Sequence, residues 1–376
     1  MKKVVILGGG NAGVFSGLFW ADKGVELEII HDPNTSTEPV GQATTVDEPR
    51  LLWRLLGLNW YNNPICASPK TGILYEGWGK LNDKSFHHFP AHFNGVHYCP
   101  KLLQKYILES NLFKVTEGNI DPDNIDADCI IDCRGRPKDY SQYNKLINPL
   151  NSAILGRPNW SVEKSPWSRH VATPDGWTFV IPSLKDSPAR DGAVGYLYNS
   201  SITEKEDAER NFLKMFDVEI TNHVSFSNYI AKDPTSDGRV FVNGNRLFFL
   251  EPMESTATTA SLRVNTEIYE YMMGHSSTEI YNHKVLTYIH QLENYILWHY
   301  CAGSKYDSPF WDYIKTMEPY DDYLERHIRI SNSYSSKDSR DPQYDHEYGQ
   351  WGTYDTKFWL DAMTKKVDSK AIYNIE

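Results

Sequence analysis

The chain opens with a short apolar run, a glycine-rich turn and a second apolar stretch. Residues 4–7 are all apolar and predict a buried strand, and residues 14–21 after the turn predict a helix. Residues 25–30 form a second apolar run, which ends at His31 and Asp32. This order predicts the β-α-β unit that begins a nucleotide-binding α/β fold.

Further along the chain, helix-like and strand-like spacings follow one another. We expect helices over three ranges: 47–58, 101–113 and 257–300. We expect strand-like segments over 71–96, 128–133, 151–198 and 240–250, the third of these as a separate sheet layer. Thr203 with Glu206 has the spacing of a capping box and predicts a helix that runs to Phe216.

The glycine turn has the spacing Gly8-x-Gly10-x-x-Gly13, directly after a strand and at the start of a helix. Its first glycine permits the tight turn, the second lets the backbone approach a pyrophosphate, and the third allows close helix–strand packing. The helix N-terminus then offers free N–H groups to phosphates. We therefore predict a dinucleotide site, with His31 or Asp32 at the ribose; the motif alone does not separate FAD from NAD.

Composition limits the partners that we expect. Forty-nine acidic residues against 38 basic ones give a net charge of −11, which does not favour nucleic acid or an anionic membrane as a partner. The five cysteines are scattered without a C-x-x-C pair, so no zinc site or disulfide framework is indicated. With no targeting or membrane-spanning pattern, a cytoplasmic protein is the expectation. Aromatic residues make up 13% of the chain, which fits an aromatic core as well as a site for a flat ligand.

Two segments carry a resemblance to the flavin-dependent halogenases, relatives of the tryptophan and pyrrole halogenases. Residues 251–256 read Glu-Pro-Met-Glu-Ser-Thr and resemble the family's E-P-L-E-S-T stretch. By this resemblance Glu254 is catalytic, and Ser255 and Thr256 lie at the halide and flavin. Residues 70–78 resemble a segment in which a catalytic lysine, here Lys70, precedes a tryptophan, here Trp78. Without the resemblance, Glu254 could be a helix-start charge and Lys70 a solvated surface lysine.

Other matches are looser. Residues 176–182 resemble the family's W-x-W-x-I-P wall beside the flavin, with Phe179 in place of the second tryptophan. Residues 41–44 resemble G-E-A-T with glutamine for glutamate, and residues 132–135 resemble D-C-S-G. The resemblance implies cofactor contacts at Gly8, Gly10, Asn11, Ala12, Gly13, His31, Asp32, Gly41, Gln42, Ala43, Thr44, Trp177, Ile181, Pro182, Gly244 and Asn245. It implies substrate contacts at Trp78, His87, Phe179, Tyr300, Phe310 and Trp311.

Two departures concern the substrate. Tryptophan-acting members carry an acid four residues before the phenylalanine of a Pro-Phe-Trp segment, where this chain has Tyr306. The chain is also shorter than typical tryptophan enzymes. Both departures argue against free tryptophan and favour a more open pocket.

The resemblance implies a fold and a reaction. The expected fold is α/β: an FAD-binding Rossmann-like domain of the flavin monooxygenase type with an intertwined β-sheet and helical substrate region. We expect one intertwined unit over 1–376, with FAD-binding parts near 1–60, 101–140 and 240–300 and substrate-side parts near 61–100, 141–239 and 301–376.

The implied enzyme takes FAD as FADH2 from a separate flavin reductase and uses oxygen and a halide ion to make hypohalous acid. Lys70 then holds this oxidant beside an electron-rich small molecule, and Glu254 stabilises the positive charge that develops on it. Two alternatives remain open on the residues alone: a flavin monooxygenase that hydroxylates its substrate, and a flavin-binding protein without catalysis.

Overall fold

The computed structural model describes residues 2–35, 37, 42–45, 47–81, 83–89, 94–159, 165–182 and 192–317. A five-stranded parallel sheet forms the nucleotide-binding half, in the order β17-β9-β1-β2-β8. Its strands are β1 (Lys3–Leu7), β2 (Glu26–His31), β8 (Lys114–Glu117), β9 (Cys129–Asp132) and β17 (Val240–Val242). The predicted strand, turn, helix and strand at the N-terminus are confirmed, with α1 at Asn11–Asp22. The parallel pairing of β1 with both β2 and β9 confirms the predicted α/β class.

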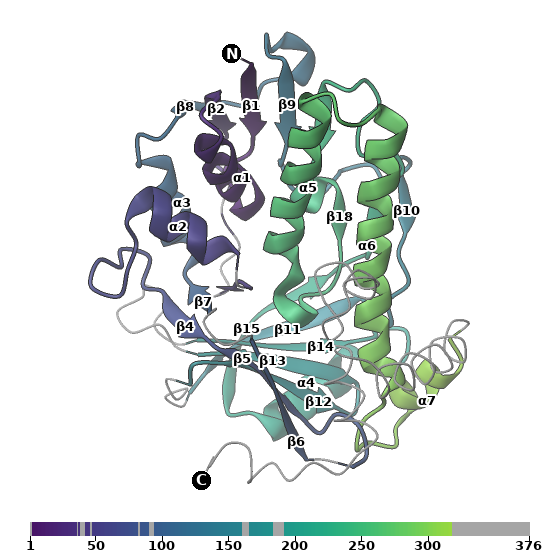
Figure 1. The fold of residues 1–376 in the computed structure, drawn as a ribbon. Helices are drawn as coiled ribbons and strands as arrows, with labels where there is room; N and C mark the ends of the chain where they lie inside the picture. The colour runs from purple at the N-terminus through teal and green to yellow at the C-terminus, as the bar shows by residue number, and fades with distance from the viewer. Residues whose placement is uncertain are drawn as a thin grey trace, which may run out of the picture.

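A seven-stranded sheet forms the second half, in the order β15-β11-β14-β13-β12-β5-β6. Its strands are β5 (Gly72–Glu76), β6 (Lys84–His88), β11 (Ser152–Pro158), β12 (Ser168–Thr173), β13 (Gly176–Ile181), β14 (Ala193–Tyr198) and β15 (Val218–Ser225). The separate sheet layer predicted over 151–198 is therefore present. Its neighbours pair antiparallel, except β12 with β5, which pair parallel. Figure 1 shows this sheet below the parallel one.

Two smaller sheets complete the strands. One has the order β3-β7-β4, with β3 at Gln42–Ala43, β4 at Ser68–Lys70 and β7 at Gly95–Tyr98. The other has the order β10-β16-β18, with β10 at Tyr143–Lys145, β16 at Tyr229–Ala231 and β18 at Phe248–Phe249. The first of these sheets carries Lys70 at the end of β4.

Helices pack against both large sheets. They are α2 (Glu48–Leu56), α3 (Pro100–Leu108), α4 (Lys205–Met215), α5 (Thr256–Met272), α6 (Thr278–Cys301) and α7 (Pro309–Lys315), with short 3₁₀ turns η1 (Pro122–Asn124), η2 (Gly244–Arg246) and η3 (Met253–Ser255). Helix α5 packs against both α1 and α6, and Figure 1 shows α5 and α6 side by side. Both long helices run toward the seven-stranded sheet, so their ends near it can carry site residues.

Two predictions of local structure were wrong, the Thr203 cap and the continuous strand over 240–250. Thr203 does not cap α4: its hydroxyl donates to Asp175, and Glu204 is the N-cap residue. The helical region predicted over 257–300 is confirmed and consists of two helices, because Gly274 adopts a left-handed φ of 82° that ends the first. The strand over 240–250 is interrupted by the 3₁₀ turn at Gly244, which also has positive φ.

Within the described ranges, no helix has the length and apolar character that crossing a lipid bilayer requires.

Candidate active site

The glycine turn has the geometry that a dinucleotide turn needs. Gly8 has a φ of 107°, and a Cβ on Gly13 would lie 1.9 Å from the Gly8 carbonyl oxygen, so the third glycine is required by packing. At Gly10, in contrast, no described atom lies within 4 Å of the position that a Cβ would take. No described side chain caps the N-terminus of α1, which leaves its first N–H groups for an anion.

The predicted cofactor residues around this turn converge. The Asn11 amide donates to the side-chain oxygen of Gln42, and the Tyr98 hydroxyl donates to the same oxygen at 3.3 Å. Ala43 lies beside Gln42 on β3, and Thr44 is buried with its N–H bonded to the Val96 carbonyl. Gly41 lies outside the described residues. The segment that follows Gly41 is therefore held at the start of α1.

Further predicted cofactor residues approach the same turn from other strands. A Cβ on Gly244 would lie 2.3 Å from that of Ala12, so this glycine permits close contact with α1, and the neighbouring Asn245 carbonyl accepts from Tyr229. His31, at the end of β2, packs against Gly9. The Asp32 carboxylate accepts from the backbone N–H and side-chain amide of Asn34.

Lys70 is a fully buried lysine. Its side chain has no exposed surface, its Nζ donates to the Ser255 hydroxyl at 2.8 Å, and the ammonium lies 5.2 Å from the centre of the Phe89 ring. Burial lowers the pKa of Lys70 to about 8, although the carboxyls of Glu254 and Glu48 act in the opposite direction. A minor fraction of this amine, roughly a tenth, is therefore neutral at pH 7.

The turn that joins β18 to α5 contains two consecutive left-handed residues. Glu254 has a φ of 65° and Ser255 a φ of 54°, which non-glycine residues adopt rarely and at a cost of about 1–3 kcal/mol each. The turn is closed by the Ser255 N–H, which donates to the Pro252 carbonyl at 3.1 Å. This conformation places the Ser255 hydroxyl on Lys70 and begins helix α5 at Thr256.

Glu254 is fully buried beside a tyrosine and two histidines. Its Oε1 accepts from the Tyr75 hydroxyl, lies 2.8 Å from His299 Nε2 and lies 3.7 Å from His87 Nδ1. Burial alone would raise the pKa of Glu254, but the hydrogen bond from His299 and the nearby imidazole of His87 hold it well below its usual value. Its second oxygen, Oε2, is buried and has no hydrogen-bond partner among the described residues. The site thus contains a carboxylate with one fixed oxygen and one uncommitted oxygen.

The other glutamate of the segment, Glu251, has a different environment. It accepts from Asn148 at 2.9 Å, from the Trp177 indole N–H at 2.8 Å and from the Tyr300 hydroxyl at 2.6 Å. Burial raises the pKa of Glu251, against these hydrogen bonds. The three donors tie the wall strand β13 and helix α6 to the turn, so Glu251 is a structural acceptor.

Further aromatic rings pack around Tyr75 and His299, the two residues that bond Glu254. Trp177 is buried with its ring 4.6 Å from that of His170, and Phe179 follows two residues later on β13. Ile181 is half-buried, and Pro182 is buried. Trp78 donates to the His170 carbonyl at 3.1 Å and packs edge-on against Tyr75, Trp311 and His299.

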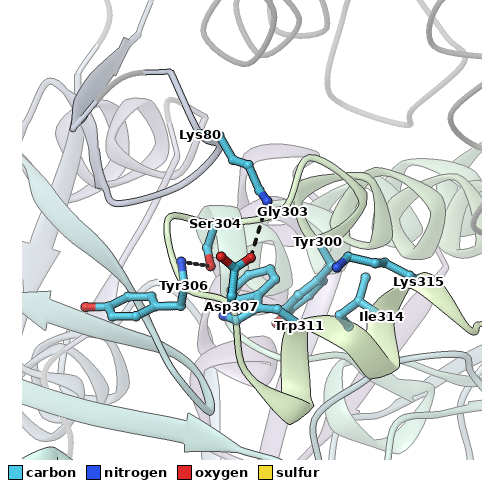
Figure 2. Close-up of a pocket in the computed structure, with 9 residues that line it drawn as sticks. All are labelled: Lys80, Tyr300, Gly303, Ser304, Tyr306, Asp307, Trp311, Ile314 and Lys315. Carbon is cyan, nitrogen blue, oxygen red and sulfur yellow. Dashed lines mark hydrogen bonds and ion pairs between the residues drawn. The ribbon is translucent and has the colours of Figure 1, made fainter.

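A hollow lies on the other side of this ring cluster. Figure 2 shows Tyr300, Trp311 and Ile314 together in it, with the ion pair of Lys80 and Asp307 at 3.3 Å across its rim. The other lining residues are Gly303, Ser304, Tyr306 and Lys315. Phe310 is buried edge-on against both Tyr300 and Trp311. Trp78 contacts both Trp311, which lines the hollow, and His299, which bonds Glu254, so aromatic rings lie between the hollow and Glu254.

The structure therefore brings together the two residues on which the sequence interpretation depends most. Lys70 donates a hydrogen bond to Ser255, which lies next to Glu254 and 185 positions after Lys70 in the sequence. Sequence reasoning missed Tyr75, His170 and His299 as members of this cluster. Tyr75 and His299 lie in segments that resemble the halogenases, but no spacing rule indicated that either side chain would meet a glutamate, and His170 gave no local signal.

Comparisons with known proteins agree on one family. A family model described as tryptophan halogenase matches residues 3–121 and 114–367. Tryptophan 7-halogenase KtzQ of Kutzneria sp. (strain 744) is 25% identical over 220 residues, which cover 53% of this chain and 40% of that protein. Tryptophan 7-halogenase RebH of Lentzea aerocolonigenes is 24% identical over 155 residues, which cover 39% of this chain and 28% of that protein. The matched segments thus span less than half the length of these relatives.

Solved structures share the whole fold. MibH, a lathipeptide tryptophan 5-halogenase, superposes with a TM-score of 0.76 at 16% identity, over 96% of this chain and 86% of that one. Tar14, a tryptophan C-6 flavin-dependent halogenase from taromycin biosynthesis, gives a TM-score of 0.77 at 19% identity, over 98% and 91%. At these identities the likeness establishes the fold, and it confirms the predicted architecture.

Proposed function

Since the chain belongs to the tryptophan halogenase family, we propose that it is a flavin-dependent halogenase that uses FADH2, oxygen and a halide ion on an electron-rich aromatic substrate. The observation that carries this proposal is the buried junction where Lys70 bonds Ser255 and the adjacent Glu254 presents an ionised carboxylate. Electrophilic halogenation needs a group that retains the oxidant and a base that accepts a ring proton. Lys70 can serve as the first and Glu254 as the second.

The residues at the glycine turn fit a dinucleotide. The open space beside Gly10 and the uncapped N-terminus of α1 suit a pyrophosphate. Two further features suit the approach of a flavin from the neighbouring strands: the hydrogen bond between Asn11 and Gln42, and the close packing of Gly244 on α1. Reduced FAD, when bound there, would supply two electrons to oxygen, and the halide would give up two more as it is oxidised to hypohalous acid, with water as the second product. We assign the separate supply of FADH2 to a flavin reductase, because the sequence has a single dinucleotide motif.

Lys70 retains the oxidant in this proposal. With a pKa near 8, roughly a tenth of the amine is neutral at pH 7. The ammonium form can donate a hydrogen bond to hypohalous acid, and the neutral form can take the halogen as a haloamine. When the ammonium form holds hypohalous acid, the substrate ring forms a carbon–halogen bond as the halogen–oxygen bond breaks. The departing hydroxide then takes the proton of Lys70 and leaves as water.

Glu254 completes the substitution. Attack of the ring on the halogen leaves a positive charge on the substrate, and a carboxylate in a water-poor site stabilises that charge strongly. Its uncommitted Oε2 is positioned to accept the ring proton, whose bonding electrons return to the aromatic system. The halide would bind at Ser255 and Thr256. There the Ser255 N–H is already bonded to Pro252, so the donors are the first N–H groups of α5.

The hollow beside Trp311 suggests which substrates enter. Tyr306 lines it where tryptophan-acting members carry an acid, and burial raises the pKa of this phenol, which therefore stays neutral. The one carboxylate in the lining, Asp307, is paired with Lys80. A substrate ammonium would find no unpaired acid among these lining residues. We propose an indole, phenol or pyrrole without a free α-amino group.

A product analysis tests the proposal. The protein is supplied with FADH2 from a reductase, oxygen and either bromide or chloride, and a panel of indoles, phenols and pyrroles that includes free tryptophan is screened by mass spectrometry. We expect products that carry the isotope pattern of the added halide, with free tryptophan converted more slowly than simple indoles. Lys70→Ala should bind FAD normally and lose product by at least about 10²-fold.

Lys145→Ala is the matched control, because Lys145 is an exposed lysine on β10 remote from the site. It should retain full activity. Products that gain oxygen whatever the halide would identify a hydroxylase and overturn the halogenase assignment. Equal turnover by Lys70→Ala would remove Lys70 from the mechanism.

A further inference from the structure

His299 makes two short contacts with groups that only accept hydrogen bonds. It is fully buried near the end of α6, where its Nδ1 lies 2.7 Å from the backbone carbonyl of Tyr295. Its Nε2 lies 2.8 Å from Oε1 of Glu254. A carbonyl oxygen has no proton to give, and neither has an ionised carboxylate.

These contacts fix the number of protons on the pair. Nδ1 must carry a hydrogen, because its partner cannot donate one. In a neutral imidazole Nε2 would then present a lone pair to the lone pairs of Glu254, which is repulsive at 2.8 Å. A hydrogen bond of this length therefore requires one proton between His299 and Glu254, as an imidazolium beside a carboxylate or as an imidazole beside a carboxylic acid.

The other groups that face the pair favour the ionised arrangement. The Tyr75 hydroxyl donates to the same oxygen, His87 Nδ1 lies 3.7 Å from it, and Lys70 lies one residue away through Ser255. His170 packs edge-on against Tyr75; burial lowers its pKa to about 3, so it adds no charge. The next carboxylate along the chain, Glu251, is occupied by its own three donors.

We propose that His299 is a positioning residue that shares one proton with Glu254 and so keeps this carboxylate ionised, with Oε1 fixed and Oε2 directed to the substrate. The inference rests on the proposed halogenase function for the role of Glu254, but the shared proton itself does not. A histidine serves here better than a neutral donor, because the imidazolium charge also offsets the burial of the carboxylate.

The proposal predicts how activity depends on pH. When pH rises far enough to remove the shared proton, a neutral imidazole opposes the carboxylate and Glu254 loses its fixed position. The kcat for halogenation should therefore fall along a basic limb that belongs to the His299–Glu254 pair. In His299→Gln a neutral amide donates in place of Nε2–H and does not titrate, so this limb should disappear.

The first measurement does not require activity. Nitrogen-15 NMR of labelled imidazoles, with the His299 signals assigned by their absence in His299→Gln, reports which ring nitrogens carry protons. At pH 7 we expect both nitrogens of His299 to be protonated in the wild type, and Nε2 to lose its proton in Glu254→Gln. An unprotonated Nε2 in the wild type at pH 7 would overturn the proposal.

The second measurement uses kinetics. His299→Leu should lower kcat by about 10²-fold or more, and His299→Gln should recover to within about tenfold of the wild type without the basic limb. His290→Gln, on the exposed side of the same helix, should leave the pH profile unchanged. Equal losses in the leucine and glutamine variants with an unaltered profile would show that His299 only packs, which refutes the proposal. Absence of halogenated product from the wild type would defeat the halogenase assignment alone, since the NMR result stands apart from it.

Discussion

The pKa values of the charged side chains in the site are shifted in different directions because their hydrogen-bond partners differ. Lys70, Glu251 and Glu254 are all buried, yet each has a distinct set of contacts. Lys70 has one hydroxyl and one aromatic ring, so burial dominates and lowers its pKa. Glu251 has three neutral donors, and its pKa is raised. Glu254 has histidines beside it, and its pKa is lowered. Residue type alone did not determine these environments.

The low pKa of Lys70 has a consequence for stability. The shift from 10.5 to about 8 corresponds to roughly 3 kcal/mol that the charged amine costs the folded state. Lys70→Met removes this cost while keeping most of the side-chain volume. We expect it to raise the free energy of unfolding at pH 7 by about 1–3 kcal/mol, although activity is lost. Chemical denaturation measures the change.

The pKa shift of Lys70 also fixes the direction in which the free energy of unfolding changes with pH. Between pH 8 and 10.5 the unfolded lysine holds a proton that the folded one has lost, so the wild type gains stability as pH rises through this window. The advantage of Lys70→Met should therefore shrink over the same range. Lys145→Met, at an exposed position, should change little at any pH. A methionine variant less stable than the wild type at pH 7 would contradict a costly buried amine.

At the scale of elements, local patterns predicted the β1-α1-β2 unit well. Its glycine spacing depends on contacts within a few residues, such as that of Gly13 with Gly8. Elements whose form depends on distant partners were predicted less well. The Thr203 hydroxyl donates to Asp175, which lies in the turn between β12 and β13, and nothing near Thr203 signals that contact. The two left-handed residues at Glu254 and Ser255 also lack a local signal, because neither is glycine.

Two glycines of the turn have different roles: Gly10 leaves space for the cofactor, and Gly13 is required by packing. Gly10 has a φ of −70° and open space around it, so Gly10→Ala should fold with nearly unchanged stability. The added methyl group would occupy the approach of the pyrophosphate, and FAD affinity should fall by at least about tenfold. Gly13→Ala should instead destabilise the fold, because its Cβ would meet the Gly8 carbonyl. Thermal unfolding and flavin titration together check both. Unchanged FAD affinity in Gly10→Ala would contradict the placement of the cofactor.

Across the whole molecule, the candidate site lies where the two halves meet. Lys70 comes from the small sheet at β4, Glu254 from the turn before α5, and His299 from the far end of α6. Physical reasoning on the sequence could not predict this convergence, since it depends on tertiary packing. The pairing of Lys70 with Glu254 was predicted through family resemblance. His299 lies in a segment that resembles the family's substrate pocket, but its contact with Glu254 emerged only from the structure.

The central claim is that Lys70 and Glu254 act together in one buried site. A double-mutant cycle on kcat, with Lys70→Ala, Glu254→Gln and the combined variant, tests it most directly. If the two residues serve one step, the combined variant should be about as slow as the slower single variant. Losses that multiply, with FAD binding retained throughout, would show that the two residues act independently and contradict the account.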